Sequence, residues 1–309
     1  MYTRLFEATL YKITAVSNLH VGNGEANFSV LDKQVQRDVI SNYPQINASS
    51  LKGALREYMT FVKFKNEEGK DSFRPLVSTI FGSEPTQGDD KAHQGYMNFH
   101  DAKLLSLPVR TNKVPFLRAT SKEVLREYQA YCKNFAIECD LDIDNLEIGH
   151  ELDETVVAEE WQYNKSINLN GLKELIGENI ILMKDEHFRT LAKELPFVAR
   201  NYLENGKSEN LWYEEIVPRE SQFYFALEQP NDNTLAYKLT QEGLDTNTLK
   251  QTKKDKVVPE YFGEFNTALN QAELFIGANT TVGYGKCKIM QLDTTIAEYK
   301  EAQDEPKKD

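Results

Sequence analysis

The chain has 309 residues, 40% of them hydrophobic, with 16 Gly and 10 Pro, a composition that allows a sizeable core and excludes a low-complexity or collagen-like protein. No window approaches eighteen consecutive apolar residues and the start lacks a basic segment before an apolar run, so we expect no membrane span and no signal peptide. The formal net charge of −12 argues, before the charges are located, against a nucleic-acid partner.

The first predicted element is a strand over residues 5–16, where polar and apolar residues alternate. From Phe6 to Leu10 the apolar residues occupy the even-numbered positions, and from Tyr11 to Ala15 they occupy the odd-numbered positions. This change predicts a bulge or a strong bend near Leu10. A glycine-bearing turn follows at residues 19–25, and the polar stretch from there to Pro44 is interpreted as a surface loop.

A helix is predicted next, behind Ser49 and Ser50, which are good N-cap residues. Apolar residues recur after them at helical spacing: Leu51, Ala54, Leu55, Tyr58 and Val62. Lys52, Arg56 and Lys63 share a stripe distinct from this apolar face. A capped helix start beside two cations can bind an anion, although a capped surface helix with solvated charges is an equally good interpretation.

Residues 95–110 are predicted to form a strand and its exit, with Pro108 ending regular pairing. Thr120 and Glu123 have the spacing of a capping box, which indicates a helix at about 121–135. The mixed pattern over residues 172–195 favours helix in part.

The last third of the chain is predicted to be rich in strands. Residues 212–227 resemble a strand pair broken at Pro218, and the polar stretch 229–256 is compatible with a loop or a projecting hairpin. The segments AELFIG, ANTTVGYG and KCKIMQLD indicate a strand, a glycine loop and a strand. We expect a single domain over 1–296 and a disordered charged tail over 297–309.

The acidic residues are concentrated in one segment. Residues 138–160 carry ten carboxylates and no Lys or Arg, which leaves 36 positive and 38 negative charges elsewhere. A basic groove in the rest of the chain is therefore compatible with the composition. We interpret the acidic run as a solvated loop or a partner-facing surface. If a nucleic acid binds elsewhere on the chain, this run should face away from it, because like charges repel.

The cysteine pattern concerns the cellular compartment. Cys132, Cys139 and Cys287 form no C-x-x-C pair and leave an odd one over. This pattern fits reduced thiols in the cytosol better than a disulfide scaffold or a structural zinc site, so we expect a cytoplasmic protein.

The glycine loop Gly277–Lys286 has two interpretations. Its glycines allow positive φ angles, so successive N–H groups could point at one phosphate, with hydroxyls and Lys286 completing an anion cradle. The loop lacks the GK[ST] of a Walker motif, and a strand follows where a dinucleotide fingerprint would open a helix. A tight hairpin turn and a phosphate site both remain open on composition alone.

Five segments together resemble the RAMP superfamily of CRISPR effector proteins: LHVGNGE, SSLKGALR, GYMNFHDAKLLSLPVR, LWYEEIVPRESQFYF and IGANTTVGYGK. Their order and spacing, from about residue 11 to 290, are most similar to the repeating backbone subunit of the type III-B (Cmr-module) effector complex. The resemblance implies an α+β fold with a ferredoxin-like (RRM-like) palm, inserted segments and a projecting thumb β-hairpin. It also implies stacking of many copies along a CRISPR guide RNA, together with other subunits of the complex, and divalent-metal-dependent cleavage of complementary target RNA.

The same resemblance implies the site residues. A catalytic aspartate is expected in the loop before the SSLKG helix, and Asp32 matches it, with Asp38 as the weaker candidate. A carboxylate there can hold Mg²⁺ or orient the attacking 2′-OH of RNA. The remaining residues are expected to bind RNA: His20, Arg37, Ser49, Ser50, Lys52, Arg56, Gly277, Asn279, Thr280, Thr281, Gly283, Tyr284, Gly285 and Lys286.

Two other functions stay open at this stage. A scaffold with the same fold could bind RNA without cutting it, and Asp32 is the residue that separates the two. A general interaction protein that docks a basic partner through its acidic run is the third hypothesis, which the two predicted anion-binding loops disfavour.

Overall fold

The computed structural model describes residues 5–24, 32–66, 73–82, 94–241 and 258–292. Its centre is a mixed nine-stranded sheet in the order β12-β13-β1-β11-β3-β4-β8-β5, with β2 also paired to β11. The strands are β1 (Phe6–Ala15), β2 (Asn98–Phe99), β3 (Lys103–Val109), β4 (Leu117–Ser121), β5 (Gly149–His150), β8 (Ile180–Met183), β11 (Gln222–Pro230), β12 (Glu273–Phe275) and β13 (Lys286–Gln291). The α+β class expected from the sequence is confirmed.

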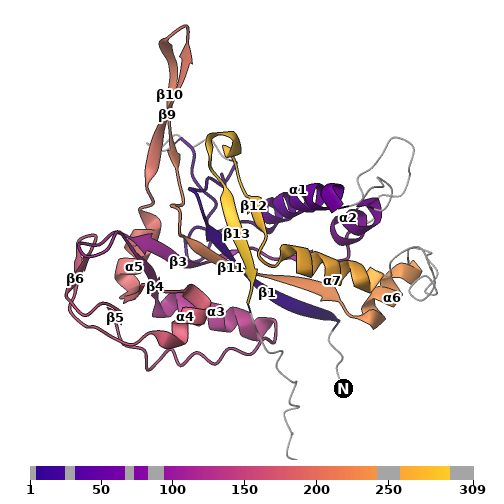
Figure 1. Cartoon of the computed structure of the whole chain (residues 1–309), viewed down its shortest axis with the longest axis horizontal. Helices are drawn as coiled ribbons and strands as arrows, with labels where there is room; N and C mark the ends of the chain where they lie inside the picture. The colour runs from indigo at the N-terminus through magenta and orange to yellow at the C-terminus, as the bar shows by residue number, and fades with distance from the viewer. Residues whose placement is uncertain (1–4, 25–31, 67–72, 83–93, 242–257, 293–309) are drawn as a thin grey trace, which may run out of the picture.

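Helices cover both faces of this sheet (Figure 1). On one face the core contains residues from α1 (Ala48–Asn66), α2 (Phe73–Phe81) and α7 (Val258–Leu269). On the other face a second cluster contains residues from α3 (Lys122–Asn134) and α4 (Asn170–Ile176). Two further helices, α5 (Asp185–Lys193) and α6 (Asp232–Gln241), flank the sheet, and a small pair β6 (Val156–Ala158) and β7 (Trp161–Tyr163) lies beside it.

The bulge predicted in the first strand is wrong. Strand β1 pairs with β11 without a break in register, from Phe6 opposite Pro230 to Thr14 opposite Gln222. Leu10 belongs to the α3–α4 cluster and Tyr11 to the opposite core, so both phases of the pattern are apolar because both faces of the strand are buried.

The two helix caps predicted from the sequence differ in the structure. Helix α1 begins at Ala48, whose N–H donates to Asp101 Oδ1 at 2.7 Å, so Ser49 and Ser50 lie in the first turn. The N-cap of α3 is Ser121, whose hydroxyl accepts the N–H of Val124, and not Thr120, whose hydroxyl donates to the Leu105 carbonyl.

Pro108 does not end the pairing of β3 but lies within it, opposite Arg118 of β4. The last residue of β3 that pairs with β11 is Ser106, so β3 has a single neighbouring strand at the proline. A ring without an N–H is tolerated where a strand has a free edge.

A long antiparallel hairpin projects from the molecule (Figure 1). It consists of β9 (Phe197–Glu204) and β10 (Lys207–Glu215), which form a separate two-stranded sheet. The two strands predicted over 212–227 with a break at Pro218 are found as the end of β10 and as β11 (Gln222–Pro230), but they do not pair with each other: β10 pairs with β9, whereas β11 pairs with β1, β2 and β3.

The hairpin considered for residues 229–256 is also not found where the chain is described, because Asp232–Gln241 is helix α6. The remainder of that stretch, 242–257, and the predicted tail, 297–309, lie outside the described residues.

The acidic run lies along β5 and β6, away from the projecting hairpin (Figure 1). Within the described part of the chain, five of its ten carboxylates pair with cations. The pairs are Arg126–Asp144, Lys165–Glu147, Lys173–Glu151, Lys113–Glu154 and Arg110–Glu159. The run is thus partly neutralised within the chain, and its orientation relative to RNA stays a prediction.

Candidate functional site

Asp32 lies at the base of the projecting hairpin. Its Oδ2 accepts a hydrogen bond of 2.8 Å from the backbone N–H of Tyr213 on β10. The next residue, Lys33, donates its N–H to the Tyr213 carbonyl and accepts the N–H of Glu215, so this segment runs parallel to β10. The hairpin base therefore fixes the position of the Asp32 carboxylate.

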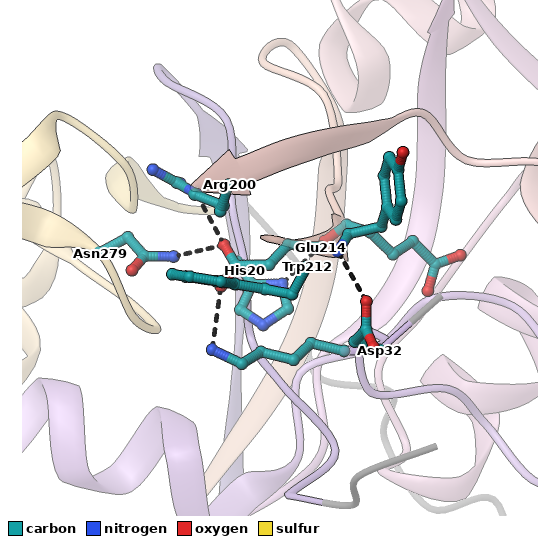
Figure 2. Close-up of polar contacts among 9 residues, drawn as sticks. His20, Asp32, Arg200, Trp212, Glu214 and Asn279 are labelled. Atoms are coloured by element: carbon teal, nitrogen blue, oxygen red, sulfur yellow. Dashed lines mark hydrogen bonds and ion pairs between the residues drawn. The ribbon is translucent and has the colours of Figure 1, made fainter. Parts of the chain in front are cut away.

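Glu214 gathers donors from three parts of the chain (Figure 2). Its side chain is 2% exposed and accepts from Lys33 Nζ at 3.1 Å and Arg200 Nε at 2.9 Å. Trp212 Nε1 and Asn279 Nδ2 donate to the same carboxylate at 2.9 and 3.0 Å. The carboxylate thus connects the Asp32 segment, both hairpin strands and the glycine loop.

The electrostatics of Glu214 follow from these contacts. Burial alone would raise the pKa of a carboxyl group, but the hydrogen bonds from Trp212, Lys33 and Arg200 outweigh it and lower the pKa of Glu214 to about 2. The group is therefore ionised at neutral pH. Two cation–π contacts surround it, with Lys33 over the Trp212 ring and Arg200 over the Tyr284 ring.

Glu215 contacts His20 through its backbone carbonyl, and Val35 and Arg37 through its carboxylate. His20 is 3% exposed and its Nδ1 lies 2.7 Å from the Glu215 carbonyl oxygen. The Glu215 carboxylate accepts from Arg37 Nη2 at 2.5 Å and from the N–H of Val35 at 3.0 Å. Arg37 also donates to the carbonyls of Asn42, Ala192 and Lys193, so its guanidinium is largely used within the chain.

The glycine loop folds against the His20 turn. The N–H of Ala278 donates to the His20 carbonyl at 2.9 Å, and a Cβ on Gly277 would lie 2.5 Å from that oxygen. Thr280, Thr281 and Gly283 are exposed in a short 3₁₀ turn. Lys286 points back to Glu273 of the same β12–β13 hairpin at 2.9 Å. The loop is thus a hairpin turn in structure, while a phosphate role stays a prediction.

Gln36 connects the first turn of α1 to the turn that contains Gly22. The Gln36 side-chain amide donates to Ser50 Oγ at 3.0 Å and to the Gly22 carbonyl at 3.1 Å. Lys52 lies over the Phe99 ring, and Arg56 donates to the Gly82 carbonyl. Burial, and secondarily the charge of Arg56, lower the pKa of Lys52. Asp101 already occupies one helix N–H, which reduces the capacity of this terminus for a second anion.

The described residues form an open cleft beside Asp32. It is lined by His20, Gly22, Asn23, Gly24, Asp32, Lys33, Gln34, Asn210 and Trp212. The structure therefore brings His20, Asp32 and the glycine loop together around β10. In the described ranges no three His, Cys, Asp or Glu side chains form a group that could hold a metal ion. A dedicated protein cage for Mg²⁺ does not fit these residues, but Asp32 fits the single carboxylate of an ion held chiefly by phosphates and water.

The sequence interpretation missed the residues that hold this site together, namely Lys33, Gln36, Arg200, Glu214 and Glu215. Glu214 and Glu215 lie in the segment LWYEEIVPRESQFYF, and two adjacent carboxylates directly after three apolar residues were a usable signal. Strand β9 was not predicted from the sequence, and the contact of Arg200 with Glu214 could therefore not be predicted either.

The two loop glycines are expected to respond differently to substitution. Gly285 and Gly283 both have positive φ, near +86° and +87°, but a Cβ on Gly285 would lie 2.6 Å from the Ile276 carbonyl oxygen, whereas Gly283 faces open space. Gly283→Ala should cost about 1 kcal/mol of unfolding free energy and Gly285→Ala about 3 kcal/mol. Denaturant unfolding of both variants measures this, and equal losses would contradict the geometry.

Comparison with known proteins places the chain in a family. Residues 12–288 match the RAMP superfamily, so the chain belongs to it. Over 94% of its length it is 29% identical to "CRISPR system Cmr endoribonuclease Cmr4" of Pyrococcus furiosus, of which it covers 97%. A second relative, "CRISPR system CMR subunit Cmr4" of Saccharolobus solfataricus, is 32% identical over 38% of this chain and 36% of its own.

Solved structures share the fold. A chain of the type III-B Cmr-beta complex bound to cognate target RNA matches with a TM-score of 0.68 at 19% identity, over 92% of this chain and 97% of that one. Oligomeric Cmr4 from Pyrococcus furiosus matches with a TM-score of 0.63 at 21% identity, over 94% and 100%. Among the described residues, no helix is long and apolar enough to cross a membrane.

Proposed function

We propose that this chain is a repeating backbone subunit of a type III-B CRISPR effector complex. In this role it binds guide RNA, stacks with copies of itself, contacts other subunits and cleaves complementary target RNA. The proposal is supported by membership of the RAMP superfamily and by a relative named as an endoribonuclease that matches along nearly its whole length. The observation that carries it is the Asp32 carboxylate, held by β10 beside an open cleft at the hairpin base.

The proposed ferredoxin-like palm consists of β1, β3, β11 and β13. In the sheet they take the order β13-β1-β11-β3, and each is antiparallel to its neighbours. Along the chain α1 connects β1 to the β3 region, and α6 and α7 connect β11 to the β12–β13 hairpin, which gives the β-α-β-β-α-β order of such folds. The β9–β10 hairpin is the proposed thumb.

The proposed chemistry needs an RNA backbone distorted at the scissile bond. The 2′-oxygen must lie in line with the P–O bond that breaks, and regular A-form stacking does not supply this geometry. Asp32 would accept the proton of the attacking 2′-OH or orient it, and a divalent ion shared with the RNA phosphates would stabilise the developing negative charge. The hairpin of a neighbouring copy is the proposed source of the distortion.

Guide binding is tested by its dependence on salt. Phosphate contacts release counterions, so Lys52→Ala with Arg56→Ala should weaken guide RNA binding equally for unrelated sequences. The slope of log K against log salt should fall by about 1.4 for two single-strand contacts. Lys113→Ala with Lys165→Ala removes the same charge from the acidic face and serves as the control. An unchanged slope in the first variant would reject the phosphate role of Lys52 and Arg56.

A further inference from the structure

Cys132 and Cys139 are brought together by a chain reversal at the end of α3. Cys132 lies in the last turn of that helix, and its carbonyl accepts the N–H of Ile137 at 2.9 Å. Ala136 adopts a left-handed conformation with φ of 46°, which turns the chain back along the helix. Gln129, one turn before Cys132, donates its side-chain amide to the Cys139 carbonyl at 3.4 Å.

The two thiols share one environment but differ in exposure. Cys132 is fully buried in the α3–α4 cluster, and Cys139 packs against that cluster while staying partly exposed. The interaction of the two thiols lowers the pKa of Cys139 to about 7 against the opposing effect of burial, and the same interaction, followed by burial, raises the pKa of Cys132. Cys139 therefore ionises before Cys132 as the pH rises through neutrality, and Cys132 keeps its proton.

An open groove gives access to Cys139. It is lined by Arg126, Gln129, Ala130, Lys133, Ala136, Ile137 and Cys139. Two of these residues are cations, although Arg126 also pairs with Asp144 at 2.9 Å. The neighbouring thiol lowers the pKa of Cys139, while burial and the negative charge of Asp140 oppose this effect. A partly exposed thiol with a lowered pKa that lines an open groove is accessible to oxidants.

The third cysteine provides an internal contrast. Cys287 lies on β13, is fully buried, and burial raises its pKa to about 12. It has neither an opening to solvent in the described structure nor a second thiol beside it.

We propose that Cys132 and Cys139 form a dithiol modification site that hydrogen peroxide or a similar hydroperoxide oxidises to an intrachain disulfide. The Cys139 thiolate attacks one peroxide oxygen, the O–O bond breaks, and sulfenic acid and hydroxide form. The Cys132 thiol then attacks the Cys139 sulfur, the S–O bond breaks, and water leaves with the Cys132 proton. Two electrons pass from the thiols to the peroxide. The disulfide would join the end of α3 to the start of the acidic run, independently of any role in RNA cleavage.

The test uses the full-length protein treated with hydrogen peroxide and digested without reduction. Trypsin cleaves after Lys133, so an intrachain disulfide links peptide 127–133 to peptide 134–165 with a loss of two hydrogens. We expect this linked pair in most chains while Cys287 stays open to alkylation after unfolding. Cys132→Ser should leave Cys139 as a sulfenic acid that dimedone traps, and Cys139→Ser should leave Cys132 unoxidised at the same peroxide dose. Cys287→Ser should behave as the wild type.

Other outcomes would overturn the proposal. Wild-type protein that keeps both thiols reduced, or that passes to sulfinic acid at Cys139 without the linked peptides, would show that the pair does not form a disulfide. Equal oxidation of Cys287 and Cys139 would show that the groove confers no selectivity. Thermal unfolding of each serine variant before peroxide treatment separates these results from a loss of folding.

Discussion

Replacement of Asp32 by Asn or Ala in the assembled complex is expected to reduce target RNA cleavage by about 10²–10⁴-fold and to leave target binding nearly unchanged. Asn keeps an acceptor for the Tyr213 N–H, so it preserves the contact that positions the loop, whereas Ala removes it. If both variants lose cleavage equally, the ionised carboxylate is required for chemistry. If only Ala loses cleavage, Asp32 acts by holding the loop.

The measurement compares cleavage ladders and target affinity for complexes assembled on one guide with Mg²⁺. Wild-type assemblies should cut at regular intervals, once per copy, while the isolated chain should cut poorly because it cannot hold and distort a paired target. Undiminished cutting by Asp32→Ala would leave the non-catalytic scaffold as the better function. Omission of Mg²⁺ tests the proposed ion separately.

Asp38 offers a matched control in the same segment. Its carboxylate accepts from the N–H groups of Ile40 and Ser41 and pairs with Lys103 at 2.5 Å. Burial opposes ionisation, but the Lys103 and Ser41 hydrogen bonds outweigh it and lower the pKa of Asp38 to about 2. Asp38→Asn should therefore lower stability and leave cleavage per folded complex unchanged. A loss of cleavage in this variant equal to that of Asp32→Asn would remove the distinction between the two aspartates.

The sequence was informative where a local pattern and the tertiary structure agree. The α1 pattern behind Ser49 and the strand–glycine loop–strand pattern around Gly283 both predicted the elements that form. Prediction failed where tertiary burial or pairing decides: Leu10 and Tyr11 are both apolar because the sheet is covered on two sides, and not because of a bulge. The strands of the projecting hairpin are largely exposed, and their apolar residues, such as Phe197, Tyr202 and Leu211, show no such alternation.

The candidate site depends on contacts that are distant in sequence. Asp32 was identified only through the resemblance, since an aspartate in a polar loop has no distinguishing pattern of its own. Its partner on β10 lies 181 residues away, and the glycine loop reaches Glu214 across 65 residues. Such separations arise from strand order, which local periodicity does not determine.

Glu214→Gln is expected to weaken both folding and cleavage. The substitution keeps the size of the side chain but leaves Lys33 and Arg200 without their negative partner. Loss of one partner of a buried ion pair costs about 3–5 kcal/mol, and we expect about 2–4 kcal/mol here because Lys33 is half exposed. Cleavage should fall as well, because Lys33 and the adjoining Asp32 segment lose one of their links to β10.

The pH dependence of stability identifies the cause of this effect. The pKa of Glu214 is lowered from 4.5 to about 2 in the folded chain, so its stabilising contribution is complete above about pH 4.5 and is lost as the pH falls toward 2. The unfolding free energy of Glu214→Gln should therefore approach that of the wild type across this acid range. Glu209→Gln, an exposed change of equal charge on the same hairpin strand, should leave the wild-type curve unaltered. A constant difference between wild type and Glu214→Gln down to pH 2 would show that packing, and not the ionised carboxylate, accounts for the loss.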